Sequence, residues 1–109
     1  MKWAVVLVGL PSKVYCVRRK QSSAEKMLTW WMKRQRAPVA WATVEVEDSV
    51  KDFDWLDMAT SRELMRMAWP HYARAENEGS RLLGRSTYYD PSAPPPAWFW
   101  ILGQGLWDD

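Results

Sequence analysis

The chain of 109 residues contains a single cysteine, Cys16, and a single histidine, His71. One cysteine cannot form a disulfide within the chain, which is typical of proteins from a reducing compartment. A structural zinc site usually needs four cysteine or histidine ligands, so these two residues cannot build one alone. A catalytic Cys16–His71 pair is the weakest hypothesis, because Cys16 stands in an apolar, strand-like segment where free cysteine usually serves as a small hydrophobic residue.

Long apolar runs and signature motifs are also absent. No stretch approaches the ~20 apolar residues of a membrane-spanning helix. Apolar residues 3–10 bear a faint likeness to a signal peptide, but no cleavage motif follows, and basic residues come next. We therefore expect a cytoplasmic protein without membrane contact. No phosphate loop, dinucleotide fingerprint or nucleophile elbow occurs, so we expect neither an enzyme nor a cofactor.

The acidic residues between 48 and 57 do not follow a metal-binding order. Asp48, Asp52, Asp54 and Asp57 have spacings that could place carboxylates together. The central glycine of an EF-hand loop is missing, however. This segment therefore predicts a polar surface rather than a metal site.

Tryptophan is abundant, with nine residues in the chain. Each indole buries about 150–250 Å² and carries one N–H that needs an acceptor. A small domain has a high ratio of surface to volume, so it buries this many indoles only with difficulty. We expect several of them to be exposed, and exposed tryptophan is typical of binding hot spots.

Residues 1–47 predict a β-β-α-β unit. Strands are expected at 2–8, 13–19 and 39–47, with a hairpin across the turn at 9–12. Ser22 and Glu25 form a capping-box pattern at the start of a helix over 22–36. An apolar stripe along this helix consists of Ala24, Met27, Leu28 and Trp31. The fold class is therefore α+β, with the helix on one face of a small, partly antiparallel three-stranded sheet.

The rest of the chain predicts a mainly helical segment at 48–85 and a proline- and aromatic-rich segment at 86–109, within a single domain. A second capping box at residues 60–63 places a helix start near Ser61, and Pro70 is expected to kink or break that helix. Gly79 and Gly84 predict a loop. The prolines at 91 and 94–96 favour extended backbone. The tract at 94–107, with the aromatic run 98–102 at its centre, either adds a strand to the sheet, wraps the body or forms an exposed binding tail.

Charge is divided unevenly along the chain. Residues 1–41 hold nine lysines and arginines against one acid, whereas residues 42–109 hold six against twelve. The two halves could neutralise each other, or the split could mark a polar partner. Two groups of partner-binding residues are expected: Trp30, Lys33, Arg34 and Arg36 on the basic side, and Trp98, Phe99 and Trp100 on the apolar side.

The leading functional hypothesis is a non-enzymatic protein-binding module. A concrete form of it is a small phage or mobile-element accessory protein that inhibits a host protein complex. The alternative is a nucleic-acid-binding protein that uses the basic half, since clustered cations and exposed indoles suit phosphates and bases. An uncovered sheet edge also makes a homodimer a reasonable expectation.

Overall fold

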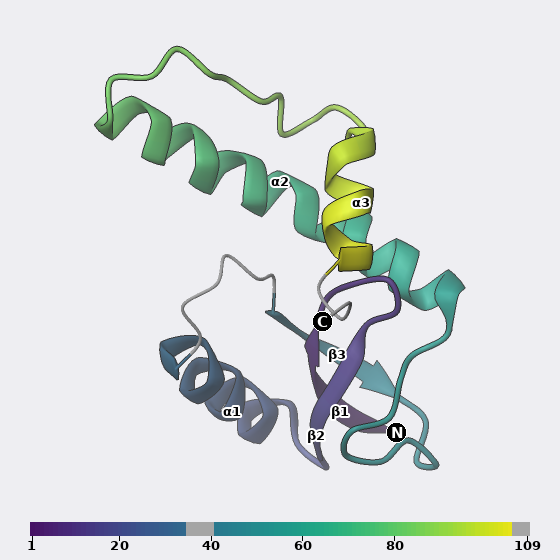
Figure 1. Ribbon diagram of the computed structural model, residues 1–109. Coiled ribbons are helices and arrows are strands. Elements are labelled where there is room, and N and C mark those ends of the chain that lie inside the picture. The colour runs from purple at the N-terminus through teal and green to yellow at the C-terminus, as the bar shows by residue number, and fades with distance from the viewer. Residues whose placement is uncertain (35–40, 106–109) are drawn as a thin grey trace.

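The computed structural model describes residues 1–34 and 41–105. Strands β1 (Lys2–Leu7), β2 (Lys13–Arg18) and β3 (Trp41–Val46) form a sheet in the order β2-β1-β3, and both pairings are antiparallel. Helix α1 (Gln21–Arg34) lies between β2 and β3 in the chain, and α2 (Met58–Leu82) and α3 (Ala97–Gly105) follow. The predicted α+β class is confirmed, and the β-β-α-β order is as expected (Figure 1).

Each face of the sheet has its own apolar core, because side chains alternate along β1. Val5 packs with Cys16 and with Ala24 of α1 on one face. Ala4 and Val6 point to the other face, where α2 and α3 supply the partners. Those partners include Leu64, Met65, Trp69, Ala73 and Phe99. The sheet is therefore the middle layer between α1 on one side and α2 with α3 on the other (Figure 1).

Helix α1 presents the predicted stripe to the sheet, since Ala24 is buried and Met27, Leu28 and Trp31 pack beside it. The predicted cap is wrong. The helix begins at Gln21, and the Ala24 N–H donates to the Lys20 carbonyl at 3.2 Å. Ser22 consequently lies inside the first turn rather than ahead of it.

Helix α2 begins three residues earlier than predicted, and its N-cap is Asp57. The Asp57 carboxylate accepts hydrogen bonds from the Thr60 hydroxyl at 2.6 Å and the Thr60 N–H at 3.0 Å. These two bonds hold the pKa of Asp57 below its ordinary value. Ser61 is buried instead, and its Oγ accepts from the Ser12 N–H at 2.9 Å. The expected cap at residues 60–63 is therefore wrong, because Thr60 lies inside the first turn and both its N–H and its hydroxyl donate to Asp57.

Pro70 does not break α2, which continues to Leu82. Proline removes one helical hydrogen bond, at a typical cost of about 3 kcal/mol. Trp69 and Ala73 on either side of it are buried in the core, and this packing stabilises the helix on both sides of the proline. Gly79 also lies inside the helix, so the predicted loop between the two glycines is wrong. Only Gly84 follows the helix end, with a φ of 70°.

The substitution Gly79→Ala is expected to raise the free energy of unfolding by about 0.5–1 kcal/mol. A methyl group at Gly79 would meet no heavy atom within 4 Å, and alanine loses less backbone entropy on folding. Urea denaturation would measure the gain. Gly84→Ala is the matched control and should lower stability, because its positive φ strains any residue with a Cβ. A loss of stability in Gly79→Ala would contradict a regular helix at this position.

The C-terminal half of α2 extends beyond the sheet, and residues 85–96 run back along it (Figure 1). We call this projection the arm. It contributes to the elongated outline of the molecule, 45 × 29 × 26 Å. The Asn77 side chain fastens the returning segment, since its amide donates to the Tyr89 carbonyl and accepts from the Tyr89 N–H, both at 2.7 Å. Residues 85–90 have neither helix nor strand.

Residues 98–102 form neither a strand nor a tail, because they belong to helix α3. The helix starts directly after the prolines, where the Pro96 carbonyl accepts from the Phe99 N–H at 3.0 Å. Phe99 and Gly103, one turn apart, face the core. Gly103 allows a close approach, since a Cβ there would lie 2.6 Å from Met65 Cε. In residues 1–34 and 41–105, no helix is long and apolar enough to cross a membrane.

Candidate partner-binding surface

Six aromatic side chains from four separate parts of the chain form one continuous series, in which five rings contact one another and the sixth is joined through a lysine. We call this series the aromatic band; its members are Tyr15, Trp30, Trp31, Trp41, Phe53 and Trp55. Trp30 contacts Trp31 at 4.9 Å between ring centroids, and Trp31 contacts Tyr15 at 5.0 Å. Tyr15 then contacts Trp41 at 5.0 Å and Phe53 at 6.3 Å. Trp55 joins through Lys13, whose Nζ lies 5.1 Å from its ring centroid.

Tyr15 reaches the centre of the band because of an irregularity in β2. Val5 pairs with Cys16 and Val6 pairs with Val14, so Tyr15 is an extra residue that has no partner on β1. A β-bulge of this kind interrupts the alternation of side chains and redirects one of them. Tyr15 therefore contacts Trp31 and Trp41 on the face that α1 covers.

Phe53 has the least favourable backbone conformation of the band, with a φ of 67°. For a bulky side chain this left-handed conformation costs about 1–2 kcal/mol. It is held by two backbone hydrogen bonds to Val14 of β2: the Phe53 N–H donates to the Val14 carbonyl, and the Val14 N–H donates to the Asp54 carbonyl, both at 2.8 Å. The Phe53 side chain is nevertheless 61% exposed. Burial of the ring therefore does not explain why phenylalanine occupies this position.

Cations lie over both ends of the band. The Arg34 guanidinium carbon is 3.6 Å from the centroid of the Trp30 ring, and Arg34 also donates to the Trp30 carbonyl at 3.1 Å. At the other end, Lys13 Nζ is 6.0 Å from the Phe53 ring centroid. Cations over aromatic faces are stabilised by the ring quadrupole and keep both partners ordered.

Carboxylates lie close to the Phe53 end of the band. The Asp52 carboxylate accepts from the Val17 N–H at 2.9 Å, and the Asp54 carboxylate accepts from the Lys51 N–H at 2.9 Å. Both aspartates are exposed. The surface around the band is thus mixed in charge, basic near Trp30 and partly acidic near Phe53.

Only some of the residues predicted for the basic side lie on this surface. Trp30 and Arg34 belong to it, and Lys33 is exposed in the same last turn of α1. Arg36 lies outside the described residues. The predicted site residues did not include Tyr15, Trp31, Trp41, Phe53 or Trp55. A bulge places Tyr15 and a left-handed backbone places Phe53, and neither feature is visible in local patterns.

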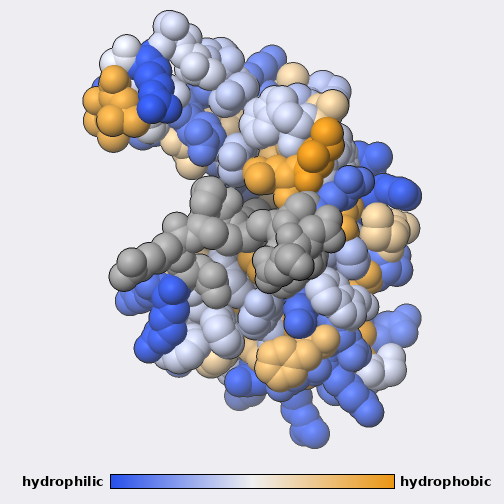
Figure 2. All heavy atoms as spheres, viewed as in Figure 1, coloured by the Kyte–Doolittle hydropathy of each residue, from blue (hydrophilic) through white to orange (hydrophobic). Residues whose placement is uncertain are grey.

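The apolar residues predicted near the C-terminus are divided between core and surface. Phe99 is 3% exposed, so its ring is not available to a partner. Trp100 is half-buried and packs against the same core. Trp98 is exposed, and Ile101 and Leu102 continue its side of α3 one turn later. Figure 2 shows an apolar patch over α3 and a second patch at the tip of the arm, where Leu82 and Leu83 are exposed.

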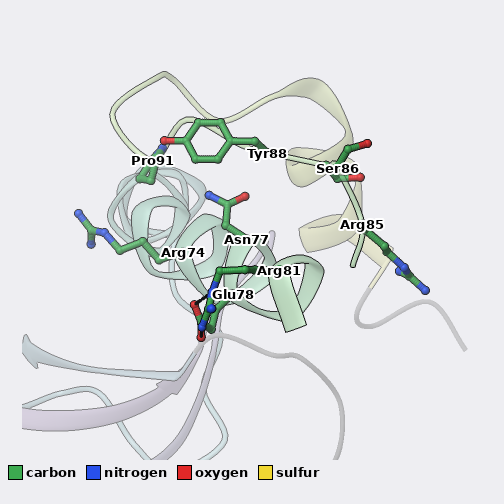
Figure 3. A pocket seen from close by; sticks show the side chains of 9 residues that line it. Arg74, Asn77, Glu78, Arg81, Arg85, Ser86, Tyr88 and Pro91 are labelled. Carbon is green, nitrogen blue, oxygen red and sulfur yellow. Dashed lines mark hydrogen bonds and ion pairs between the residues drawn. The ribbon is translucent and has the colours of Figure 1, made fainter. Parts of the chain in front are cut away.

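A shallow pocket lies on the arm, between α2 and the returning segment (Figure 3). It is lined by Arg74, Asn77, Glu78, Arg81, Arg85, Ser86, Thr87, Tyr88 and Pro91. Arg81 forms an ion pair with Glu78, which lowers the pKa of that carboxyl, and Asn77 is bonded to the Tyr89 backbone. In Figure 3 the Arg85 side chain points away from the other two arginines. Several polar side chains that line the pocket are therefore already paired within the chain.

The structure does not bring Cys16 and His71 together. Cys16, in β2, is buried between the sheet and α1. His71 is exposed on α2, on the other side of the sheet. Burial raises the pKa of the Cys16 thiol, and the positive charge of Arg18 opposes the rise only in part. Within residues 1–34 and 41–105, no three potential ligands are grouped to hold a metal ion.

Comparisons with protein-family models, with curated proteins and with solved structures found no match to this chain. The function is therefore argued from the chemistry of the surface itself.

Proposed function

We propose that this chain is a non-enzymatic protein-binding module and that the aromatic band contacts its protein partner. The observation that carries the proposal is Phe53, a bulky residue in a strained backbone conformation with an exposed ring. Glycine or asparagine would adopt this conformation at lower cost. Strained residues of this kind cluster at functional sites, where the strain positions a group for its task.

The band has the residue composition of a binding hot spot, and its rings are held in place by contacts within the chain. Trp30, Phe53 and Trp55 are 42%, 61% and 48% exposed, and each is contacted by a ring or cation of its own chain. Tryptophan, tyrosine and arginine dominate hot spots. The two aromatic residue types bury a large area and have only two side-chain torsions to fix. Rings that are ordered before binding lose little entropy on contact.

The charges beside the band favour a protein over a nucleic acid. A nucleic-acid strand stacked along the six rings would bring phosphates near Asp52 and Asp54, and carboxylates repel phosphate. The nucleic-acid alternative rests on the basic end of the band, where Lys33 and Arg34 lie in the last turn of α1, next to Trp30. A protein partner with both basic and acidic groups matches the whole band. An accessory protein that inhibits a host protein complex is the concrete form of this proposal.

Affinity capture from cells of the source organism, followed by calorimetry with the purified partner, tests the proposal. The double variant Trp30→Ala/Phe53→Ala is expected to weaken partner binding at least ~30-fold, which corresponds to the 2 kcal/mol or more of a hot spot. Trp98→Ala is the matched control, because Trp98 is exposed to a similar degree on a different surface. Retention of full affinity by the double variant would refute the band as the site.

The nucleic-acid alternative is tested by titration with short single- and double-stranded oligonucleotides, followed by indole fluorescence. At about 50 mM and 200 mM salt we expect no quenching that collapses as the salt concentration rises. Strong quenching at low salt that is lost in Lys33→Glu/Arg34→Glu would establish the alternative instead.

A further inference from the structure

The two edges of the sheet differ in how far other described residues cover them with hydrogen bonds. The outer edge of β2 is covered by residues 52–56, which exchange backbone hydrogen bonds with Val14 and donate from Leu56 to the Ser12 carbonyl at 2.9 Å. The Asp52 side chain covers the Val17 N–H on the same edge. On the other side of the sheet, β3 makes no hydrogen bond within the described residues beyond its pairing with β1.

Strand β3 also has few of the features that normally prevent an edge from pairing, with Glu45 its one charged residue. Its six residues, Trp41–Val46, contain no proline and no lysine. Its register with β1 is unbroken from Lys2–Val46 to Leu7–Trp41, so no bulge twists the edge away. A regular, uncovered edge offers a row of backbone donors and acceptors to a further strand.

We propose that the outer edge of β3 pairs antiparallel with β3 of a second copy, so that two three-stranded sheets join across a twofold axis. This dimer goes beyond the proposed function and does not depend on it. An interface across a twofold axis uses the same surface twice, so each favourable contact occurs two times.

The charges near β3 match a second copy. Trp41 stacks on Trp31 at 6.0 Å and 16°, so the first residue of β3 lies beside the last turn of α1. That turn carries the exposed cations Lys33 and Arg34. At the other end of the strand, Glu45 lies four residues after Trp41 and therefore points to the same face of the sheet. Its partner on β1, Trp3, packs against the core on that face.

Antiparallel pairing brings the first residue of one strand beside the last residues of the other. The cationic turn of one copy therefore lies toward Glu45 of the other copy, with exposed Glu47 just beyond it. Symmetry repeats this contact at the opposite end of the pair. The edge of β3 in a second copy thus has both the backbone groups and the charges that match this edge. An unrelated strand would match only if it happened to have the same charges.

Sedimentation equilibrium of the full chain between about 1 and 200 µM measures the dimer directly, because dimerisation depends on concentration. The wild-type chain is expected to dimerise within this range. Glu45→Lys alone and Lys33→Glu/Arg34→Glu alone should each weaken the dimer at least ~10-fold, since each places like charges together twice. An equimolar mixture of the two variants should restore dimers, because opposite charges then face each other. Glu63→Lys on α2 is the matched control and should leave the dimer unchanged.

Hydrogen exchange provides an independent measurement of the same contact. Amide protection in β3 should rise with protein concentration, whereas protection in β2 should not, because the edge of β2 is covered within each copy. A chain that stays monomeric throughout, or a dimer that neither charge variant weakens, would overturn the proposal. Phe53→Ala should leave the dimer intact, so failure of this inference and failure of the aromatic band as a binding site can be told apart.

Discussion

Replacement of Trp69 with alanine is expected to lower the free energy of unfolding by about 3–5 kcal/mol, the usual cost of truncating a large buried aromatic residue. Trp69 is 2% exposed and lies at the centre of a second aromatic cluster. Its ring centroid is 5.1–6.3 Å from those of Tyr72, Tyr89, Trp98 and Phe99. These rings come from α2, from α3 and from the segment between them. The cavity left by Trp69→Ala would therefore weaken the packing of all three parts.

A hydrogen bond adds to the role of Trp69. Its indole N–H donates to the Asp90 carbonyl at 3.1 Å, which helps to hold the returning segment of the arm on α2. Trp69→Phe keeps most of the ring contacts and removes this donor, so its cost should be clearly smaller, about 1–3 kcal/mol. Trp30→Ala, a truncation of the same residue type at an exposed position, is the surface control.

Urea denaturation of the three variants would measure these differences. Folded domains of this kind are stable by only about 5–15 kcal/mol, so Trp69→Ala should be partly unfolded at room temperature if the chain lies at the low end of that range. Equal costs for Trp69→Ala and Trp30→Ala would show that the second aromatic cluster does not stabilise the fold.

Local periodicity explains which elements could be predicted from the sequence. The stripe of α1 repeats at helical spacing over two turns, and the strands are rich in β-branched residues, so both signals are read within short windows. The apolar run at 98–102 is too short to distinguish a helix from a strand. As a helix, this segment packs Phe99 into the core and brings Gly103 close to Met65, so its contacts come from distant parts of the chain.

The aromatic band could be predicted only in part, because its members meet through long-range contacts. The abundance of tryptophan correctly indicated exposed indoles: Trp30, Trp55 and Trp98 are exposed, whereas Trp69 is buried. The position of Tyr15 depends on a bulge against β1, and that of Phe53 depends on hydrogen bonds to Val14. Neither conformation has a local sequence signal, since phenylalanine is among the residues least suited to a positive φ.

Phe53→Gly is expected to separate stability from binding. Glycine adopts a φ of 67° without strain, so the substitution should recover about 1–2 kcal/mol of backbone energy. It also removes the ring contact with Tyr15 and the contact with Lys13, which together are worth about 1–2 kcal/mol. The free energy of unfolding should therefore stay within about 1 kcal/mol of the wild-type value, whereas partner affinity should fall at least ~30-fold.

Phe53→Ala is the control for this separation, because alanine loses the same ring contacts and keeps the backbone strain. It should be less stable than Phe53→Gly by about 1 kcal/mol and equally poor in binding. Urea denaturation and calorimetry with the purified partner measure the two quantities. A loss of more than about 2 kcal/mol in Phe53→Gly would mean that the ring serves the fold, since only a structural contact would then explain the cost. Equal stability of the wild type and Phe53→Gly, with binding lost, would mean that the strained backbone is retained to present this ring to a partner.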